Sequence, residues 1–365
     1  MELLIPLSRA LKMNIGEVNI RCIIFITMIT QNFHSSSCGR LSLLSKLDNR
    51  PQKQHPLVLI PGIGGSQVYC LPKQYKAKPF PVWLSLLNMV FPSRINHLAH
   101  LKYDPIKQIS VDNDNCEIVF PGWGDTKVLE NINSDGYSLG NYFHDLVNTL
   151  KGDNYFKSNF TIRGAPYDFR RSPIFMTWLK RLIEETYVNG CNRSVVIVAH
   201  SLGSLYTKYF LDRQTSRWKE KYIKTFISAA APFGGSMVAL STILSGTNFD
   251  IFIHNPMRNR LLFRTLTSVS FLLPNPQLWP PDLPVIFTPT KNYTLNLYHE
   301  LFQDINFPIG YQMMISSKHQ SDMIKDPQNV PEILCVHSSN LLSVKQLIYK
   351  TSGYFVMPFL ITHQY

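Results

Sequence analysis

One serine in the sequence lies in a context typical of nucleophilic catalysis. Residues 195–199 form an apolar, mostly β-branched run, which predicts a buried parallel strand. The run ends at a small-x-Ser-x-Gly turn centred on Ser201, with Ala199 as its first small residue, and residues 202–210 then place apolar side chains at helical spacing. Strand, tight turn and helix together predict a nucleophile elbow, which raises the serine hydroxyl above the sheet. We therefore predict that Ser201 is a nucleophile.

A glycine-rich turn follows a second short apolar strand. The strand covers residues 57–60, and the sequence Pro-Gly-Ile-Gly-Gly-Ser occupies residues 61–66. In an α/β-hydrolase, such a loop supplies one backbone N–H of the oxyanion hole and the residue after the nucleophile supplies the other. We assign these roles to Ile63 and Leu202. A phosphate-binding loop is the alternative, but the sequence contains no GxxxxGK[ST] motif.

The elements that position these groups alternate between strands and helices. Further strands are predicted at residues 225–229 and 333–336, and helices at residues 136–150 and 178–187. This alternation predicts an α/β fold with a mostly parallel central sheet. Residues 237–290 are irregular, apolar and rich in proline, which indicates a cap or lid inserted after a core strand.

The charge and the cysteine content of the chain indicate which partners and cofactors to expect. The net charge is +12, but lysine and arginine form no dense block, so we expect no nucleic-acid partner. A dispersed positive surface suits anionic lipid, and a basic surface without a partner is the alternative. The six cysteines form no CxxC or Cys/His cluster, so we expect no metal and no cofactor. One or two disulfides are compatible with the sequence, and their pairing stays open.

The N-terminus has the pattern of a secretory signal. A short apolar run at residues 22–30 follows basic residues and precedes a stretch of small residues, which predicts a signal or leader over residues 1–38. A buried strand or an uncleaved leader is the alternative, and the run is too short to span a membrane. Three glycosylation sequons fit a secretory route, at Asn159, Asn192 and Asn292.

Seven stretches, in order, carry a family signature. They are HPLVLIPGIGGSQ (55–67), VWLSLLNMVFP (82–92), VFPGWGDT (119–126), RGAPYDFRR (163–171), VVIVAHSLG (195–203), FISAAAPFGGS (226–236) and TPTKNYTLNLYHELFQDINF (288–307). With these stretches, the chain resembles the lecithin–cholesterol acyltransferase and lysosomal (group XV) phospholipase A2 family, and more closely its lysosomal branch. The resemblance runs from about residue 55 to about residue 336.

The resemblance implies a fold and a chemistry. It implies an α/β-hydrolase domain over residues 51–337, with a membrane-binding subdomain at 66–120 and the cap at 237–290. The serine would attack an ester of a glycerophospholipid and pass the acyl group to water or to a lipid alcohol. It also implies a membrane or lipoprotein surface as partner and a lysosomal or secreted location. The segment matching the family's membrane-binding region supplies candidate lipid contacts, and a core helix is the alternative. These candidates are Trp83, Leu84, Leu87 and Phe91.

The sequence departs from the family in two places before its tail. Ile63 stands where the family has an acidic residue or a cysteine. The family's disulfide in the membrane-binding subdomain has no evident counterpart, because Cys70 is out of register and no cysteine lies between it and Cys116. Cys335 matches one half of the family's second disulfide, whose partner would lie beyond the similarity.

The tail lacks the matched acid and base of a hydrolase. The expected order is Ser, then Asp or Glu, then His, each after a later strand. Residues 338–365 contain no Asp or Glu and one histidine, His363, so no triad partner is carried over and the C-terminal strand-helix region is incomplete. A strand over residues 355–362 would be needed to bring His363 to Ser201, and Pro358 argues against it. Other acids and histidines are partners on paper only: Asp304, Asp322, Asp326, His299, His319 and His337.

Two accounts of this tail stay open. In one, the chain is a truncated or misassembled product of a gene whose full version is active. In the other, it is a divergent pseudo-enzyme that binds lipid or membrane without turnover. Both predict that the chain is catalytically impaired, because a serine is a weak nucleophile without a base.

Overall fold

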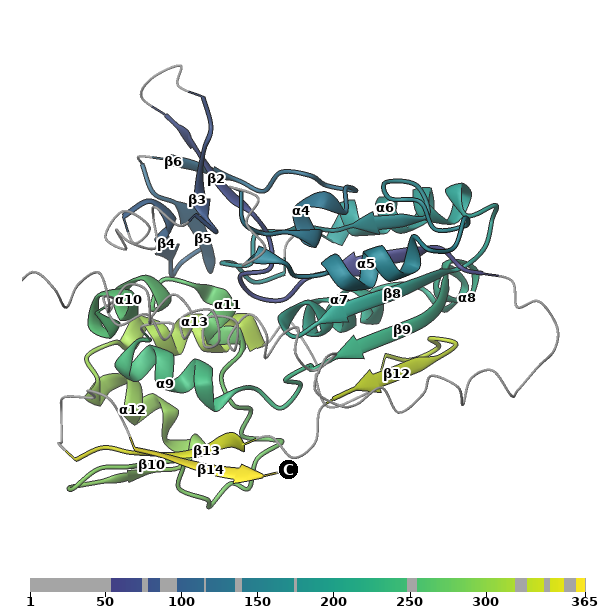
Figure 1. Ribbon diagram of the computed structural model, residues 1–365. Coiled ribbons are helices and arrows are strands. Elements are labelled where there is room, and N and C mark those ends of the chain that lie inside the picture. Colours follow the sequence, from purple (N-terminus) through teal and green to yellow (C-terminus); the bar gives the residue numbers. More distant parts are fainter. Residues whose placement is uncertain are drawn as a thin grey trace, which may run out of the picture.

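The centre of the molecule is a parallel sheet, seen in a computed structural model that describes residues 54–73, 78–85, 97–114, 116–134, 140–173, 176–247, 255–318, 327–337, 342–350 and 359–364 (Figure 1). The sheet has five described strands in the order β12-β9-β8-β1-β7, and every pairing among them is parallel. The strands are β1 (Leu57–Ile60), β7 (Ile162–Gly164), β8 (Val195–His200), β9 (Ile223–Ala229) and β12 (Ile333–Val336). The predicted α/β fold with a mostly parallel sheet is confirmed.

Helices cover both faces of this sheet. They are α4 (Lys127–Glu130), α5 (His144–Leu150), α6 (Met176–Asn189), α7 (Leu202–Asp212) and α8 (Ser216–Tyr222). Successive strand residues point to opposite faces. In β1, Leu57 and Leu59 therefore belong to a cluster with α4 and α5, while Val58 and Ile60 belong to the larger core with α6 and α7. The central strand β8 is enclosed on both faces by this arrangement.

A small subdomain follows β1 in the chain. It contains a three-stranded sheet, β3-β2-β6, and a hairpin of β4 and β5. The strands are β2 (Val68–Pro72), β3 (Phe80–Trp83), β4 (Leu101–Asp104), β5 (Ile109–Asp112) and β6 (Cys116–Val119). The antiparallel pairing of β2 with β6 brings the Cα atoms of Cys70 and Cys116 to 5.6 Å, and a disulfide joins the two residues. The sequence had left the pairing open because β2 and β6 are 46 residues apart.

A cap lies between β9 and β12 in the chain. Its helices are α9 (Met237–Ser245), α10 (Pro256–Phe263), α11 (Thr267–Phe271), α12 (Tyr298–Asp304) and α13 (Pro308–Lys318), with the short 3₁₀ helix η4 (Leu295–Leu297). A four-stranded sheet, β11-β10-β13-β14, packs beside them (Figure 1). Its strands are β10 (Ile286–Phe287), β11 (Asn292–Tyr293), β13 (Leu342–Ile348) and β14 (Phe359–Gln364). The inserted region between β9 and β12 therefore extends well beyond residue 290.

The tail after β12 folds onto the cap. Strand β12 is the last strand of the central sheet among the described residues, as predicted. Strand β13 instead pairs with β10, and β14 pairs with β13. The sequence did not predict this sheet, because β13 pairs with β10, which is only two residues long, and β14 pairs only with β13 among the described strands.

Two further properties concern the described residues alone. None of their helices combines the length and apolar character needed to cross a membrane. They also contain no group of three or more His, Cys, Asp or Glu side chains placed to hold a metal ion. The leader predicted over residues 1–38 lies outside the described residues.

Candidate active site

Ser201 lies in a strained turn between β8 and α7. Its φ of 51° and ψ of −123° are unusual for a residue other than glycine. Its N–H donates to the carbonyl oxygen of Ala229 at 2.8 Å, which ties the turn to the neighbouring strand β9. A Cβ on Gly203 would lie 2.2 Å from the carbonyl oxygen of Pro61, so this position requires glycine. The turn has the strand–turn–helix geometry of a nucleophile elbow.

The glycine-rich loop after β1 packs directly against this serine. A Cβ added to Gly62 would lie 2.9 Å from the Cβ of Ser201. The next residue in the loop is Ile63, and Leu202 begins α7, where first-turn N–H groups have no acceptor inside the helix. Within the described part of the chain, neither Ile63 nor Leu202 donates its backbone N–H in a hydrogen bond. Leu202 therefore directly follows Ser201 in the chain, and Ile63 directly follows Gly62, the residue that packs against the serine.

Tyr167, from the loop after β7, holds the same glycine-rich loop at both ends. Its hydroxyl donates to the carbonyl oxygen of Pro61 at 2.9 Å, and its N–H donates to Ser66 Oγ at 3.1 Å. The ring is 2% exposed. Burial raises the pKa of Tyr167, so its hydroxyl stays protonated and keeps donating. The RGAPYDFRR stretch thus has a structural role in shaping the site.

His200, beside the nucleophile, is not oriented as its base. The imidazole is 6% exposed, and burial lowers the pKa of His200 to about 4. Its Nδ1 lies 2.5 Å from the hydroxyl oxygen of Tyr142. No local sequence pattern predicts this contact, because 58 residues separate the two side chains.

The membrane-contact candidates have different placements. The Trp83 indole is partly buried, and its Nε1–H donates to the carbonyl oxygen of Gly64 at 2.8 Å. Leu84 is fully buried in the cluster with α4 and α5, so the lipid contact predicted for this side chain is wrong for this structure. Leu87 and Phe91 lie outside the described residues.

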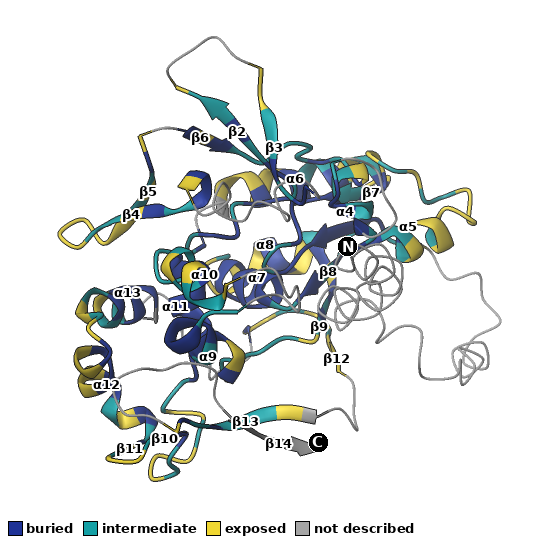
Figure 2. Cartoon of the chain, turned by 60° about the vertical axis from the view of Figure 1, so that its left-hand side comes forward, coloured by how far each residue is buried: buried dark blue, intermediate teal, exposed yellow. Residues whose placement is uncertain are grey.

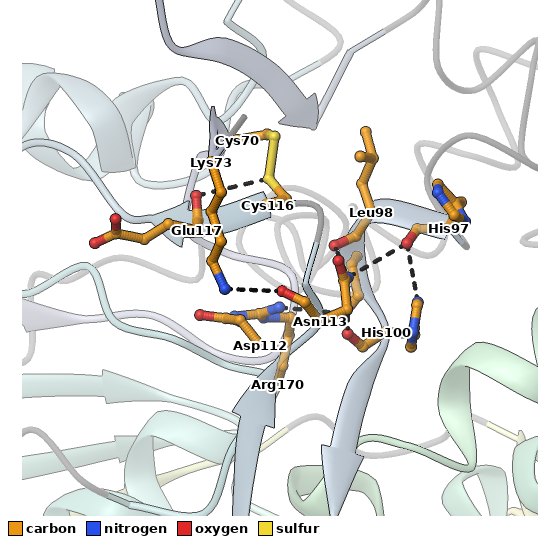
Figure 3. The surroundings of a disulfide bond; sticks show 11 residues. Cys70, Lys73, His97, Leu98, His100, Asp112, Asn113, Cys116, Glu117 and Arg170 are labelled. Atoms are coloured by element: carbon orange, nitrogen blue, oxygen red, sulfur yellow. Dashed lines mark hydrogen bonds and ion pairs between the residues drawn. A yellow bond between two sulfur atoms is a disulfide. The ribbon is translucent and has the colours of Figure 1, made fainter. Parts of the chain in front are cut away.

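An ion-pair network joins the small subdomain to the loop after β7. The Arg170 guanidinium, 2% exposed, contacts Asp112 Oδ1 at 2.6 Å (Figure 3) and Asp168 Oδ2 at 2.8 Å. It also donates to the carbonyl oxygen of Ala99. Burial opposes the charge of Asp112, but Arg170 and Arg171 outweigh it and hold the pKa of this carboxyl below its usual value. The network anchors β5 beside the catalytic edge of the sheet.

The other side of the site, at the ends of β9 and β12, contains no comparable set of polar side chains among the described residues. The N–H of Ala230 donates to the carbonyl oxygen of Val336 at 2.8 Å, so the end of β12 lies beside the end of β9. With neighbouring strands about 4.8 Å apart, this point is about 10 Å from β8. The next residue is the exposed His337, and residues 338–341 are not described. No carboxylate of the described residues follows β12, where a hydrolase places its acid.

The alternative triad partners lie elsewhere. Asp304 accepts from the Tyr293 hydroxyl and pairs with Lys291 at the surface of the cap. His299 packs against Tyr311. His363 lies on β14, opposite Ser343 of β13, so its strand joins the cap sheet and not the central one. The remaining candidates, Asp322, Asp326 and His319, lie outside the described residues.

The three sequon asparagines, Asn159, Asn192 and Asn292, are all exposed. Asn159 also accepts a hydrogen bond from the N–H of Thr126 through its Oδ1. Glycosylation at these sites stays a prediction.

The parallel sheet, the elbow between β8 and α7 and the inserted cap define an α/β-hydrolase. The sequence model of the family described as lecithin:cholesterol acyltransferase matches residues 80–355. The match extends past residue 337, where sequence reasoning had placed the end of the resemblance, and includes β13. The chain belongs to the lecithin:cholesterol acyltransferase family.

Three relatives illustrate the similarity. The lysosomal phospholipase A and acyltransferase of Homo sapiens is 37% identical over 281 residues, covering 72% of this chain and 68% of that protein. Its Rattus norvegicus counterpart is 33% identical over 327 residues, covering 85% and 78%. The phosphatidylcholine-sterol acyltransferase of Homo sapiens is 30% identical over 314 residues, covering 80% and 69%. A solved structure, the Tle4–Tli4 complex, aligns at a TM-score of 0.40 and 10% identity, over 76% of this chain and 69% of that one.

Proposed function

We propose that this fold performs serine-dependent acyl chemistry on glycerophospholipid esters. The observation that carries the proposal is the strained backbone of Ser201, packed against the loop that holds Ile63. The serine Oγ attacks the ester carbonyl, the N–H groups of Ile63 and Leu202 stabilise the resulting oxyanion, and the lysophospholipid alcohol leaves. Water or a lipid alcohol then attacks the acyl-enzyme and releases the acyl group. The family relatives, which are phospholipases and acyltransferases by name, support this class of reaction.

We further propose that the chain in its present form is catalytically impaired. Proton transfer from Ser201 needs a base, and the base needs an orienting acid. His200 is buried against Tyr142, and the described end of β12 provides His337 without a carboxylate. In a serine protease, loss of the base costs about a million-fold in turnover and loss of the acid about ten-thousand-fold. The second candidate function is therefore lipid binding without turnover. It is favoured by the lack of a carboxylate at the described end of β12.

The first experiment treats the full chain with a serine-directed fluorophosphonate and maps the adduct. We expect slow labelling confined to Ser201, absent in Ser201→Ala and unchanged in Ser216→Ala, which alters an exposed serine on α8. Labelling that survives in Ser201→Ala would contradict the nucleophile. Fast, stoichiometric labelling of the unaltered chain would contradict the impairment, and its loss in His363→Ala would identify a triad that β14 completes.

A second experiment separates lipid binding from turnover. We propose that the small subdomain over residues 66–120 contacts a membrane or lipoprotein surface. Phosphatidylcholine vesicles, with and without anionic lipid, are sedimented with the unaltered chain, and acyl release is assayed in the same samples. Retained binding with no acyl release supports the lipid-binding function. If the chain binds neither kind of vesicle, the lipid-binding function is contradicted.

We also propose that the chain follows the secretory pathway, to a lysosomal or secreted location. The exposed sequons at Asn159, Asn192 and Asn292 support this route. N-terminal sequencing of the protein from secreting cells should show loss of about the first 38 residues. Glycosidase treatment should lower the apparent mass, and Asn292→Gln should remove one step of that shift. An intact N-terminus with no glycan would contradict this route.

A further inference from the structure

The loop that carries Ile63 is a tight turn whose two sides are each held by a side chain. The N–H of Gly65 donates to the carbonyl oxygen of Gly62 at 3.1 Å, which closes a four-residue turn with Ile63 second and Gly64 third. Gly64 has a φ of +73°, the conformation that a type II turn requires at its third residue. Because a trans peptide directs its C=O and N–H in opposite directions, fixing the Gly62 carbonyl also fixes the direction of the Ile63 N–H.

Tyr142 holds the first residue of this turn by a hydrogen bond. Its hydroxyl oxygen accepts the N–H of Gly62 at 2.9 Å. The ring also fills the space under the turn, since a Cβ on Gly65 would lie 2.9 Å from Tyr142 Cζ. The same hydroxyl also shares a hydrogen bond with His200 Nδ1, 2.5 Å away. A chain of hydrogen bonds therefore runs from the turn to the residue before the nucleophile.

Trp83 holds the third residue of the turn by a second hydrogen bond. Its indole Nε1–H donates to the carbonyl oxygen of Gly64 at 2.8 Å, and the Gly64 Cα side faces the same ring, with a built Cβ 3.5 Å from Trp83 Cζ2. Trp83 is the last residue of β3 and so belongs to the small subdomain. This bond connects the subdomain assigned to lipid contact with the loop that carries the oxyanion donor.

We propose that Tyr142 and Trp83 are positioning residues, which act through the turn at 62–65 to aim the Ile63 N–H at the Ser201 site. This inference rests on the proposed function, in which that N–H stabilises the oxyanion. The three glycines of the loop would otherwise leave its backbone free to adopt other conformations. The two side chains restrict that freedom at different residues of the turn, Tyr142 at Gly62 and Trp83 at Gly64. Trp83 is thereby given a role inside the site in place of a membrane anchor.

The test uses three tryptophan or tyrosine variants of the full chain. Trp83→Phe and Tyr142→Phe each remove one donor or acceptor and keep an aromatic ring. Trp218→Phe is the matched control, since it removes an indole N–H that donates to Glu184 Oε1 at 2.7 Å, between α8 and α6. The first measurement is hydrogen–deuterium exchange in peptides covering residues 57–66, which needs no catalysis. We expect about tenfold faster exchange in Trp83→Phe and Tyr142→Phe, confined to this loop, and no change in Trp218→Phe.

The second measurement is the fluorophosphonate reaction at Ser201. Removing one oxyanion donor costs about a hundredfold or more in rate, so a misdirected donor should lower the limiting phosphonylation rate about tenfold with probe affinity unchanged. A loss of stability alone would not lower the limiting phosphonylation rate while leaving the probe affinity unchanged. Binding to phosphatidylcholine vesicles should be equal in Trp83→Phe and the unaltered chain.

Two outcomes would overturn the inference. One is unchanged exchange of residues 57–66 in both variants. The other is weaker vesicle binding by Trp83→Phe with normal exchange, which would make Trp83 a lipid contact. Failure of the proposed function is separable, because an unaltered chain that is never labelled at Ser201 still reports on the turn through exchange. If Tyr142→Phe does not fold, Trp83→Phe alone decides.

Discussion

The two sides of β8, the strand before Ser201, differ in how firmly the neighbouring segments are held. On the side of β1, the loop after the strand is fixed by Tyr167, Tyr142 and Trp83, all through hydrogen bonds of 2.9 Å or less to its backbone. On the other side, β12 is the edge strand of the described sheet, and Leu334 and Val336 are 44% and 45% exposed. In Figure 2, β12 carries exposed colours, while α7, the helix after Ser201, is mostly buried.

The difference follows from where each part of the site comes from. The nucleophile and its oxyanion donors lie between residues 57 and 236, where strands, turns and loops pack on one another. The acid and base of a hydrolase follow later strands. Here the chain leaves the central sheet after β12 and pairs with β10 in the cap. The half of the site proposed to stabilise charge is therefore held in place by the fold, while the described residues provide no acid after β12 for the half that would move a proton.

The largest effect is expected from a substitution that disrupts the packing on the β1 side. Gly203→Ala places a Cβ 2.2 Å from the carbonyl oxygen of Pro61 and 2.9 Å from that of Ile60, both backbone atoms that cannot rotate away. We expect a loss of about 3 kcal/mol or more in unfolding free energy, measured by urea denaturation. Gly152→Ala is the control, because its nearest atom, Thr149 O, lies 3.1 Å away at an exposed site, and there we expect little change. Equal effects at both glycines would contradict the packing described here.

The second prediction concerns the pH dependence contributed by His200. Its pKa is lowered by burial to about 4, against about 6.5 in an unfolded chain, so the unfolded state takes up the proton first. Stability should therefore fall as the pH drops from about 6.5 to about 4, by about 1.4 kcal/mol per unit and about 3 kcal/mol in all. Urea midpoints across this range measure the slope. His200→Gln should flatten it, while His299→Gln, on the exposed side of α12, should not.

A third prediction compares one hydrogen-bond deletion on each side. Tyr142→Phe leaves the buried Gly62 N–H and His200 Nδ1 unpaired, at a cost of about 2 kcal/mol. Thr225→Val, between β9 and β12, removes a bond to Glu332, whose exposed carboxylate water can solvate. This change should cost less than about 1 kcal/mol. Equal costs, measured by urea denaturation, would mean that the β12 side is as well packed as the β1 side.

The sequence predicted the parts of this molecule that depend on neighbouring residues. The strand before Ser201, the elbow and the glycine turn are local patterns, and each is found where expected. The contact between Tyr142 and His200 joins residues 58 positions apart, and neither residue type is diagnostic of it. The Cys70–Cys116 bond and the cap strands likewise depend on pairings that only the folded chain brings together. Long-range pairing, not local propensity, limited the prediction.

The smallest effect on stability is expected at the exposed edge. Leu334→Lys changes a side chain that is 44% exposed on β12, so the unfolding free energy should change by less than about 0.5 kcal/mol. An apolar edge strand is a template for pairing with another chain, and a lysine opposes that pairing. Light scattering at rising protein concentration should therefore show less self-association. Ile106→Lys is the control. It adds the same charge at a residue that is 92% exposed and lies between β4 and β5, outside the central sheet. If both variants reduce association equally, net charge and not the β12 edge controls it, and the contrast between the two sides of β8 would be one of packing alone.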